Sequence, residues 1–261
     1  HLIGIGGCSM NGLAQILKNQ GHTVTGSDRE RTQFTDALDS QGIPYSVGHT
    51  GEYLKDADLV IYSAAIKPDN PERALARELG IAELERSVAL GQISERFQEV
   101  VAIAGCHGKT TITSMLSAAN ELSGTNATIH VGGYVDHLSG GVKVGGLDTF
   151  ITEACEYVES FLTLHPTIAL INNIDNDHLD YFGDFDHILH AFEKFLALLP
   201  EDGTFVACTD DPHVRALAEK SDRRVVTYGL EGGDYSASQL TFDDKGNPRF
   251  TVLYQGKPMG C

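Results

Sequence analysis

The chain of 261 residues exceeds the usual size of one hydrophobic core, so two domains are the natural expectation. Its hydrophobic content of 41% excludes a disordered chain. The 36 acidic and 19 basic residues give a formal net charge of −17. Such an excess of acid disfavours nucleic acid and anionic membranes as partners, because both are bound through Lys and Arg.

Cysteine usage and the absence of long apolar runs bear on the compartment. No stretch approaches the roughly 18 to 20 apolar residues of a membrane span, so membrane insertion is not expected. No two of the five cysteines form a C-x-x-C pair, which indicates reduced thiols and a cytoplasmic protein; they are Cys8, Cys106, Cys155, Cys208 and Cys261. The chain opens within a strand and stops without a closing helix, so we expect it to be part of a longer protein.

The first third alternates between strand and helix patterns. Apolar runs predict strands, and apolar residues at helical spacing predict helices. The strands are expected at 2–7, 23–28 and 58–62, and the helices at 13–21 and 32–41. This order predicts a Rossmann-like α/β domain with a parallel sheet and helices on its faces.

A second series of elements begins with the apolar run 100–104. Its glycine turn leads into a helix from Lys109, and Pro200 ends a strongly amphipathic helix. Strands are expected near 127–131, 148–153, 167–171, 203–207 and 223–228, and an antiparallel hairpin follows 232 with its turn at 243–247. We therefore predict two domains, 1–95 and 96–261, the second being an α/β domain whose glycine turn after a strand is of the P-loop type.

The segment 105–111 has the features of a phosphate-binding loop. It reads Gly105, Cys106, His107, Gly108, Lys109, Thr110 and Thr111, a shortened form of the motif with Ile103 where the eight-residue form has glycine. Glycines let backbone N–H groups face phosphate oxygens, the Lys reaches the terminal phosphates and a hydroxyl ligates Mg²⁺. A glycine turn with an exposed lysine is the alternative. The apolar strand before the turn and the helical face after it favour phosphate binding.

Metal ligands are expected where two predicted strands end. Glu153 closes one strand, and the segment 172–180 follows another with three acids and His178. Such a charge cluster beyond a buried strand is poorly compensated without a cation. We therefore expect Thr110, Glu153 and His178 to hold metal. A solvated acidic loop is the alternative.

The opening glycine turn, 4–9, begins like a dinucleotide fingerprint. Asp28 ends the second predicted strand, where a carboxylate can hold a ribose hydroxyl. Ser9 stands at the third glycine position, so a turn without ligand is an equal alternative. A second turn of small residues, from Ser63 to Ile66, follows the strand 58–62 and favours a ligand at this end of the sheet.

In order and spacing these segments resemble the Mur ligase family over essentially the whole chain, with its alanine-adding members as the nearest pattern. The opening 3–14 is similar to I-G-I-G-G-x-G-M-S-G-L-A, the loop 105–111 to G-T-H-G-K-T-T, the segment 153–156 to E-A-D-E and 173–180 to N-I-E-x-D-H-x-D. The segments 62–66 and 69–72 resemble the block between the first two. Three residues depart from the family pattern: Ser9 for glycine, Cys106 for threonine and Cys155 for aspartate.

The resemblance implies an ATP-dependent ligase that joins L-alanine to UDP-N-acetylmuramate through an acyl phosphate in peptidoglycan synthesis. It implies that the first domain binds the UDP-sugar through Gly6, Gly7, Cys8, Ser9, Asp28, Ser63 and Ala64, while the loop 105–111 binds Mg-ATP. Lys109, Glu153 and His178 are the implied catalytic residues. Lys109 neutralises phosphoryl charge, Thr110 and Glu153 hold Mg²⁺, and Thr111 contacts the α-phosphate. His178 ligates a second ion or positions the carboxylate.

The resemblance also implies a third, amino-acid-binding domain that this sequence does not contain, so we expect the chain alone to bind ligands without turnover. Some relatives use a carbamylated lysine, and Lys194 cannot be assigned that role from the sequence. Three alternatives remain. They are a ligase that attaches a recycled tripeptide to the same UDP-sugar, a non-catalytic UDP-sugar-binding module and an NAD-dependent enzyme, the last disfavoured by the loop at Lys109.

Overall fold

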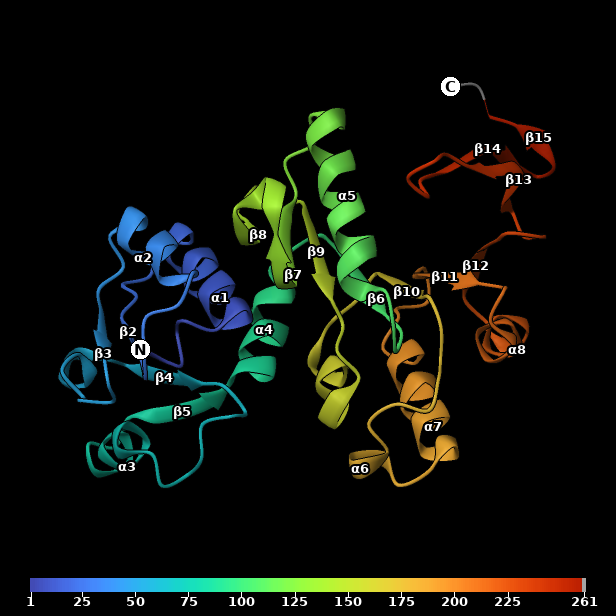
Figure 1. The fold of residues 1–261 in the computed structure, drawn as a ribbon. Coiled ribbons are helices and arrows are strands. Elements are labelled where there is room, and N and C mark those ends of the chain that lie inside the picture. The colour runs from blue at the N-terminus through green and yellow to red at the C-terminus, as the bar shows by residue number, and fades with distance from the viewer. Residues whose placement is uncertain (260–261) are drawn as a thin grey trace. The chain divides into compact units, whose positions relative to one another are not determined.

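The computed structural model describes residues 1–259, coloured in chain order in Figure 1, so Cys261 lies outside the described residues. The chain forms two compact units. Unit 1 comprises residues 1–100 and 110–153, and unit 2 comprises 101–109 together with the chain from Ala154 onward. This grouping follows packing and not chain order, so the predicted division at residues 95 and 96 stays a prediction.

Unit 1 contains a five-stranded sheet in which every strand is parallel to its neighbours, as the alternating pattern predicts. The strand order is β3-β2-β1-β4-β5, and the strands are β1 Leu2–Ile3, β2 Gly26–Asp28, β3 Tyr45–Val47, β4 Leu59–Tyr62 and β5 Ala82–Glu85. The helices between and after them are α1 Cys8–Asn19, α2 Thr35–Gln41, α3 Pro71–Glu78 and α4 Arg86–Ser94. The strands at 2–7 and 23–28 are shorter than predicted because glycines and polar residues take up the rest.

Helix α3 shows how local sequence sets an element here. The Asn70 side chain accepts hydrogen bonds from the backbone N–H groups of Glu72 and Arg73, and Pro71 occupies the first helical position. Ala76 on the inner face packs into a buried cluster with residues of β1 and β4; the cluster contains Ile3, Leu54, Val60 and Ala76. Capping and an apolar face thus place the start of α3 at the carboxyl end of β4.

Unit 1 also holds a three-stranded group and most of helix α5, Lys109–Ser123. Strand β7, Thr128–Val135, pairs parallel with β9, Thr149–Glu153, and antiparallel with β8, Gly140–Lys143. Helix α1 packs on β7 and β8. Gly12 makes this packing close, since a Cβ there would lie 2.9 Å from Cδ2 of His130.

Unit 2 is built on the strand order β15-β14-β13-β12-β11-β10-β6. Four neighbouring strands of this sheet are parallel to one another: β6 Glu99–Ala104, β10 Ile168–Ile171, β11 Thr204–Cys208 and β12 Arg224–Gly229. The predicted hairpin is confirmed, with β13 Tyr235–Phe242 antiparallel to β14 Pro248–Tyr254, and β15 Lys257–Pro258 at the edge. The helical segments are the 3₁₀ segment η3 Tyr157–Thr163, α6 Leu179–Phe182, α7 Phe185–Leu196 and α8 Pro212–Lys220.

Aromatic packing holds α7 in unit 2. Phe192 and Phe195 on its inner face are fully buried. The Phe161 ring of η3 stacks on Phe195 at a centroid distance of 4.7 Å and meets Phe192 edge-on at 5.4 Å. This contact anchors the segment that follows β9, where several polar candidates lie.

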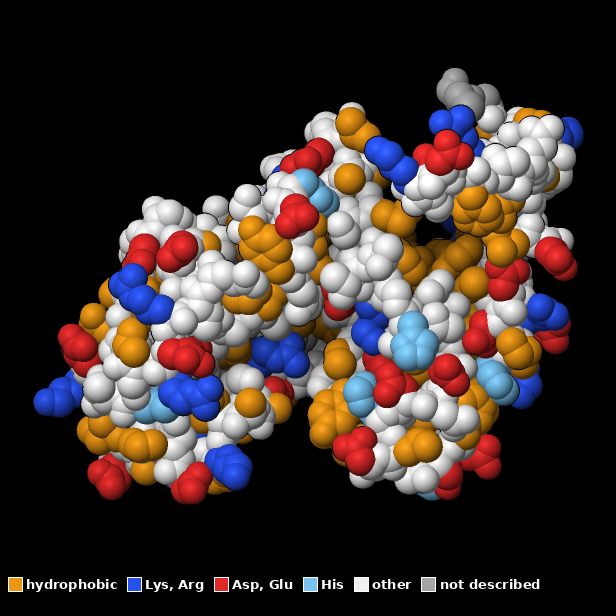
Figure 2. Space-filling view, viewed as in Figure 1, with side chains coloured by type: hydrophobic (Ala, Val, Ile, Leu, Met, Phe, Trp, Pro, Cys, Tyr) orange, Lys and Arg blue, Asp and Glu red, His pale blue; other side chains and the backbone are white. Residues whose placement is uncertain are grey.

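On the face drawn in Figure 2, Lys and Arg side chains alternate with Asp and Glu and do not gather into one basic patch. Among the described residues, no helix is long and apolar enough to cross a membrane.

Candidate nucleotide and metal sites

The loop between β6 and α5 needs its two glycines. Gly105 and Gly108 have positive φ angles of 131° and 86°. A Cβ on Gly105 would lie 3.1 Å from the backbone N and O of Asn173, and one on Gly108 would lie 3.0 Å from Nδ2 of Asn172. Both conformation and space therefore exclude larger residues at these positions.

Two asparagines after β10 hold the loop in shape. The His107 carbonyl accepts hydrogen bonds from Asn172 Nδ2 at 3.1 Å and Asn173 Nδ2 at 3.0 Å, and its N–H donates to Asn173 Oδ1 at 2.8 Å. The Cys106 N–H donates to the Asn173 carbonyl at 3.1 Å. The loop is thus formed by contacts within unit 2, with the His107 side chain left largely exposed.

Cys106 takes the place of the family's threonine and ties the loop to the segment that carries His178. Its Sγ accepts a hydrogen bond from the Asp175 N–H at 3.2 Å and lies 3.4 Å from the Asp175 carbonyl. Burial raises the pKa of the Cys106 thiol to about 11. The neutral thiol can therefore both donate and accept, as a hydroxyl would.

Lys109 is folded back onto its own loop. Its Nζ donates to the carbonyls of Gly105 at 2.6 Å and Cys106 at 3.3 Å and to Oε2 of Glu156 at 2.7 Å. The side chain of Glu156 is only 1% exposed, and its other oxygen, Oε1, has no hydrogen-bond partner among residues 1–259. The lysine expected at the phosphates thus has a buried carboxylate as its counterion.

Glu156 also belongs to a group with metal-ligand geometry. The group contains Glu156, Asp177 and His178, and each offers one ligand atom. These three atoms lie within 4.8 Å of one another. His178 Nε2 is 3.7 Å from Glu156 Oε1, and the His178 ring lies 4.7 Å from that of Tyr157. His178 has a positive φ of 54°, a strained backbone conformation of the kind that gathers at functional sites. A divalent cation would satisfy the orphaned oxygen of Glu156, so the residues fit a metal.

Thr110 and Glu153 both lie beside the backbone of Gly132 and Gly133 in unit 1. A Cβ on Gly132 would lie 2.7 Å from Glu153 Oε2, and one on Gly133 would lie 3.3 Å from Thr110 Cγ2. Glu153 Oε1 is buried without a hydrogen-bond partner in the described part of the chain, and the Thr110 side chain is exposed. An unpaired carboxylate oxygen in this position also fits a cation. Thr111 is exposed at the start of α5, and its expected contact with the α-phosphate stays a prediction.

The first glycine turn is braced by Asp28. The Gly6 N–H donates to Asp28 Oδ2 at 2.8 Å, and the Gly6 carbonyl accepts from Thr32 Oγ1 at 2.7 Å. Gly7, the N-cap residue of α1, makes no side-chain capping hydrogen bond, and the N–H groups at a helix N-terminus favour an anionic ligand. Asp28 therefore has a structural function in addition to the ribose contact predicted for it.

The other residues predicted for the UDP-sugar lie around this turn. A Cβ on Gly4 would lie 3.8 Å from Cβ of Ser63, which places the turn of Ser63 and Ala64 beside it. The Cys8 Sγ donates weakly to the Val131 carbonyl at 3.7 Å. Burial, helped by the charge of Glu153, raises the pKa of the Cys8 thiol to about 11. The sequence-predicted set is thus gathered at the carboxyl ends of β1 and β4.

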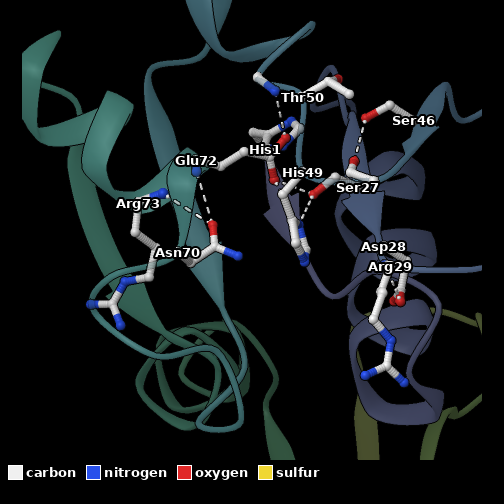
Figure 3. Close-up of polar contacts among 12 residues, drawn as sticks. His1, Ser27, Asp28, Arg29, Ser46, His49, Thr50, Asn70, Glu72 and Arg73 are labelled. Carbon is white, nitrogen blue, oxygen red and sulfur yellow. Dashed lines mark hydrogen bonds and ion pairs between the residues drawn. The ribbon is translucent and has the colours of Figure 1, made fainter.

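Unit 1 also contains a buried acid, Glu72, that the sequence does not reveal. The Glu72 carboxylate accepts from the Gly51 N–H at 3.0 Å, from the Ser27 hydroxyl and from His49 Nδ1, and His1 Nε2 is 3.6 Å away (Figure 3). Burial alone would raise its pKa, but the hydrogen bonds from His1, Ser27 and Gly51 outweigh burial and lower the pKa to about 2. Glu72 thus joins α3 to β1, β2 and the loop after β3.

Sequence reasoning missed several residues of these sites. Glu156 stands three residues after Glu153, at the second acid of the E-A-D-E pattern, so a signal was present. Asn172 and Asn173 lie in the segment 172–180, in which the acids and His178 alone indicate a site. Lys194 pairs with Glu159 through an Nζ to Oε1 distance of 2.9 Å on a half-exposed surface, and no function follows for it from this contact.

Comparison with known proteins gives two family matches. The model described as the Mur ligase family catalytic domain matches residues 1–98, and the Mur ligase middle domain matches residues 103–260. The UDP-N-acetylmuramate–L-alanine ligases of Alkaliphilus metalliredigens and Acetivibrio thermocellus are 46% and 48% identical over 261 and 255 residues. These alignments cover 100% and 97% of this chain but 57% and 54% of the relatives, so the chain spans little more than half of their length.

Solved structures show the same arrangement of elements. A UDP-N-acetylmuramate–alanine ligase from Thermotoga maritima is 28% identical with a TM-score of 0.85, over 99% of this chain and 58% of that one. A UDP-N-acetylmuramate:L-alanyl-gamma-D-glutamyl-meso-diaminopimelate ligase from Neisseria meningitides is 27% identical with a TM-score of 0.84, over 99% and 84%. The middle-domain match alone covers more than half of the chain, and with the loop at Lys109 in place we conclude that the chain belongs to the Mur ligase family.

Proposed function

We propose that the protein joins L-alanine to UDP-N-acetylmuramate at the expense of ATP, as part of peptidoglycan precursor synthesis. The observation that carries this proposal is the placement of Lys109 beside Glu156, Asp177 and His178 on a glycine loop held by Asn172 and Asn173. The names of the close relatives support the substrates. In the reaction, the sugar carboxylate takes the γ-phosphoryl group of ATP, and the amine of L-alanine displaces phosphate from the resulting acyl phosphate as the amide forms.

The chain's own residues divide this work. The loop 105–108 presents backbone N–H groups to the phosphates, and Lys109 exchanges its contact with Glu156 for the phosphoryl oxygens on which charge develops. Thr110 and Glu153 would hold one metal ion, while Glu156, Asp177 and His178 would hold a second. When bound, Mg²⁺ supplies charge neutralisation at the transferred phosphoryl group. The first glycine turn, with Asp28 and Ser63, would bind the UDP-sugar.

The test is substitution of Lys109 in the full-length ligase. We expect Lys109→Ala to abolish phosphate release that depends on both substrates, with a fall of about 1,000-fold or more because the lysine acts on the transferring group. Lys194→Ala is the matched control, since that lysine pairs with Glu159 on a half-exposed surface. Near-normal turnover of Lys109→Ala would contradict the proposal.

A second candidate is ligation of a recycled tripeptide to the same UDP-sugar. The likeness to the Neisseria ligase, at a TM-score of 0.84 and with 84% of that chain covered, favours it. Parallel acceptor assays with L-alanine and with the tripeptide separate the two activities. We expect L-alanine to be used and the tripeptide to be ignored; the reverse result would replace the first proposal by the second. Because these nucleotide substrates are cytoplasmic metabolites, we also propose that the protein works in the cytoplasm.

A further inference from the structure

Ser9, the residue that departs from the family's glycine, is held by two side chains that no motif includes. Its Oγ lies 3.1 Å from Nε2 of His130 and accepts a hydrogen bond from Nη1 of Arg86 at 3.2 Å. His130 comes from β7, and Arg86 is the first residue of α4. The hydroxyl thus links three parts of unit 1 that are far apart in sequence.

The surroundings of His130 fix its tautomer. The ring is 3% exposed, and burial, helped by the charge of Arg86, lowers its pKa to about 4, so it is neutral at pH 7. Nε2 also lies 3.1 Å from the Ser9 carbonyl, which can only accept, so Nε2 carries the hydrogen. Nδ1 lies 3.3 Å from the Thr152 hydroxyl oxygen. Because Nε2 and Arg86 are both donors, the Ser9 hydroxyl keeps its own hydrogen for another acceptor.

Arg86 has no counterion within the described residues. The Arg86 side chain is partly buried, and its guanidinium donates a hydrogen bond to Ser9. Between residues 1 and 259 no carboxylate lies within 4.0 Å of it. The neighbouring Arg73 shows the usual arrangement, with Nε 2.6 Å from Glu83 and the Tyr62 ring 3.6 Å from its guanidinium. A partly desolvated guanidinium with most of its five N–H donors unused favours an anionic ligand, and its planar fork suits phosphate.

We propose that Arg86 and the Ser9 hydroxyl bind the diphosphate of the UDP-sugar, and that His130 is the positioning residue that holds Ser9 in place. This inference rests on the proposed function of the first glycine turn, to which Ser9 already belongs, and adds Arg86 and His130 to it. Arg86 supplies the charge, and Ser9 supplies an oriented hydroxyl donor. His130 supplies a neutral donor whose hydrogen bonds to Ser9 fix the start of α1.

Calorimetry of the chain with UDP-N-acetylmuramate and with UDP tests the assignment, with Mg-ATP as a third ligand that should bind unchanged. We expect Arg86→Met to weaken both uridine ligands by about tenfold or more, and Arg86→Lys to weaken them less, because lysine keeps the charge but not the fork. Ser9→Gly should cost about threefold to tenfold. Arg96→Met is the matched control, since Arg96 contacts Gln20 at the other end of α1 and also lacks a carboxylate within the described residues.

The positioning function of His130 has its own readout. His130→Gln keeps an N–H donor near the Nε2 position and should retain affinity for UDP, whereas His130→Leu should lose as much as Ser9→Gly and add nothing to it in the double variant. The conservative variant keeps the test valid if His130→Leu does not fold. Equal affinities of Arg86→Met and Arg96→Met, or a loss confined to UDP-N-acetylmuramate, would overturn the assignment. Failure of the unsubstituted chain to bind either uridine ligand would instead overturn the proposed function and this inference with it.

Discussion

The chain has two glycine turns, each at the carboxyl end of a parallel strand, and they are stabilised in opposite ways. The first, after β1, is braced by Asp28 and by neutral donors, and the guanidinium of Arg86 beside it has no carboxylate partner in the described residues. The second, after β6, has its lysine bound to the buried carboxylate of Glu156. The first turn presents an unused cation, whereas the second presents one that is already paired.

This difference bears on how each turn receives an anionic ligand. A ligand at the first turn has only water to displace from the cation, because the turn is shaped by contacts within its own backbone and with Asp28. A phosphate at the second turn must replace Glu156 as the partner of Lys109, and Glu156 then needs another cation. Four substitutions or titrations examine this contrast, in order of decreasing expected effect.

Removal of the charge of Glu156 should have the largest effect. We expect Glu156→Gln to lower turnover of the full-length ligase by about 100-fold or more, because it removes a metal-ligand oxygen and the counterion of Lys109 together. Phosphate release measured against Mg²⁺ concentration gives the result. Glu159→Gln, which removes an acid that pairs with the half-exposed Lys194, is the control. An unchanged Mg²⁺ dependence of Glu156→Gln would contradict the assignment of Glu156 as a metal ligand.

Acid should next destabilise unit 1 through Glu72. The folded-state pKa of Glu72, about 2, lies below the ordinary value of 4.5, so its stabilisation is full above pH 4.5 and is lost as pH falls towards 2. The lowering corresponds to about 3 kcal/mol of unfolding free energy. Urea unfolding at pH 5, 4 and 3 should show this loss in the unsubstituted chain and in the exposed-site control Glu52→Gln. Glu72→Gln should be less stable than the unsubstituted chain at pH 5, and its unfolding free energy should fall less between pH 5 and pH 3. An equal fall in Glu72→Gln and Glu52→Gln would contradict the stabilisation assigned to Glu72.

Gly132→Ala should damage metal binding with little effect on folding. The new Cβ would lie 2.7 Å from Glu153 Oε2, and the flexible carboxylate would move at small cost to stability. A displaced ligand oxygen should weaken Mg-ATP binding by about tenfold. Calorimetry and thermal unfolding measure the two effects. Gly140→Ala is the control, because its Cβ would meet no atom closer than 3.9 Å. A large fall in melting temperature without loss of affinity would contradict the prediction.

Asp28→Asn should have the smallest effect. Asparagine keeps an oxygen to accept the Gly6 N–H but loses the charge, which should cost about 1 kcal/mol of stability and weaken UDP binding a few-fold. Unfolding in urea and calorimetry with UDP measure both, with the exposed Asp58→Asn as control. A loss as large as that of Arg86→Met would show that Asp28 and not Arg86 dominates the first turn.

Much of the fold was predictable because its parallel strands are continuous apolar runs that end in glycines. The strand at 100–104, the loop 105–111 and the helix from Lys109 follow from such a run. The edge strands β3 and β5 were not predicted, because each is short and only partly buried. Neither were α3 and α4: α3 is short and polar overall, and the apolar residues of α4 show only weak helical periodicity.

The candidate sites were predictable only where one local motif contains them. Lys109, Thr110 and His178 stand in motifs that a reader can find, and the structure places His178 beside Asp177 and Glu156. Glu156 stands in the E-A-D-E segment as well, but only the structure shows that this second acid is buried and paired with Lys109. The contact of Ser9 with His130 joins residues 121 positions apart, a pairing that no local pattern can reveal.

The bond between Lys109 and Glu156 has a thermodynamic consequence for the order of ligand binding. Glu156 is the counterion of Lys109 in this structure, and on the proposed function the same carboxylate would hold a cation once nucleotide is bound. Loss of Glu156 to a cation would then free Lys109 for phosphate, and loss of Lys109 to phosphate would free Glu156 for a cation. Each ligand must raise the affinity of the other by the same factor, so the loop accepts nucleotide and metal as a linked pair.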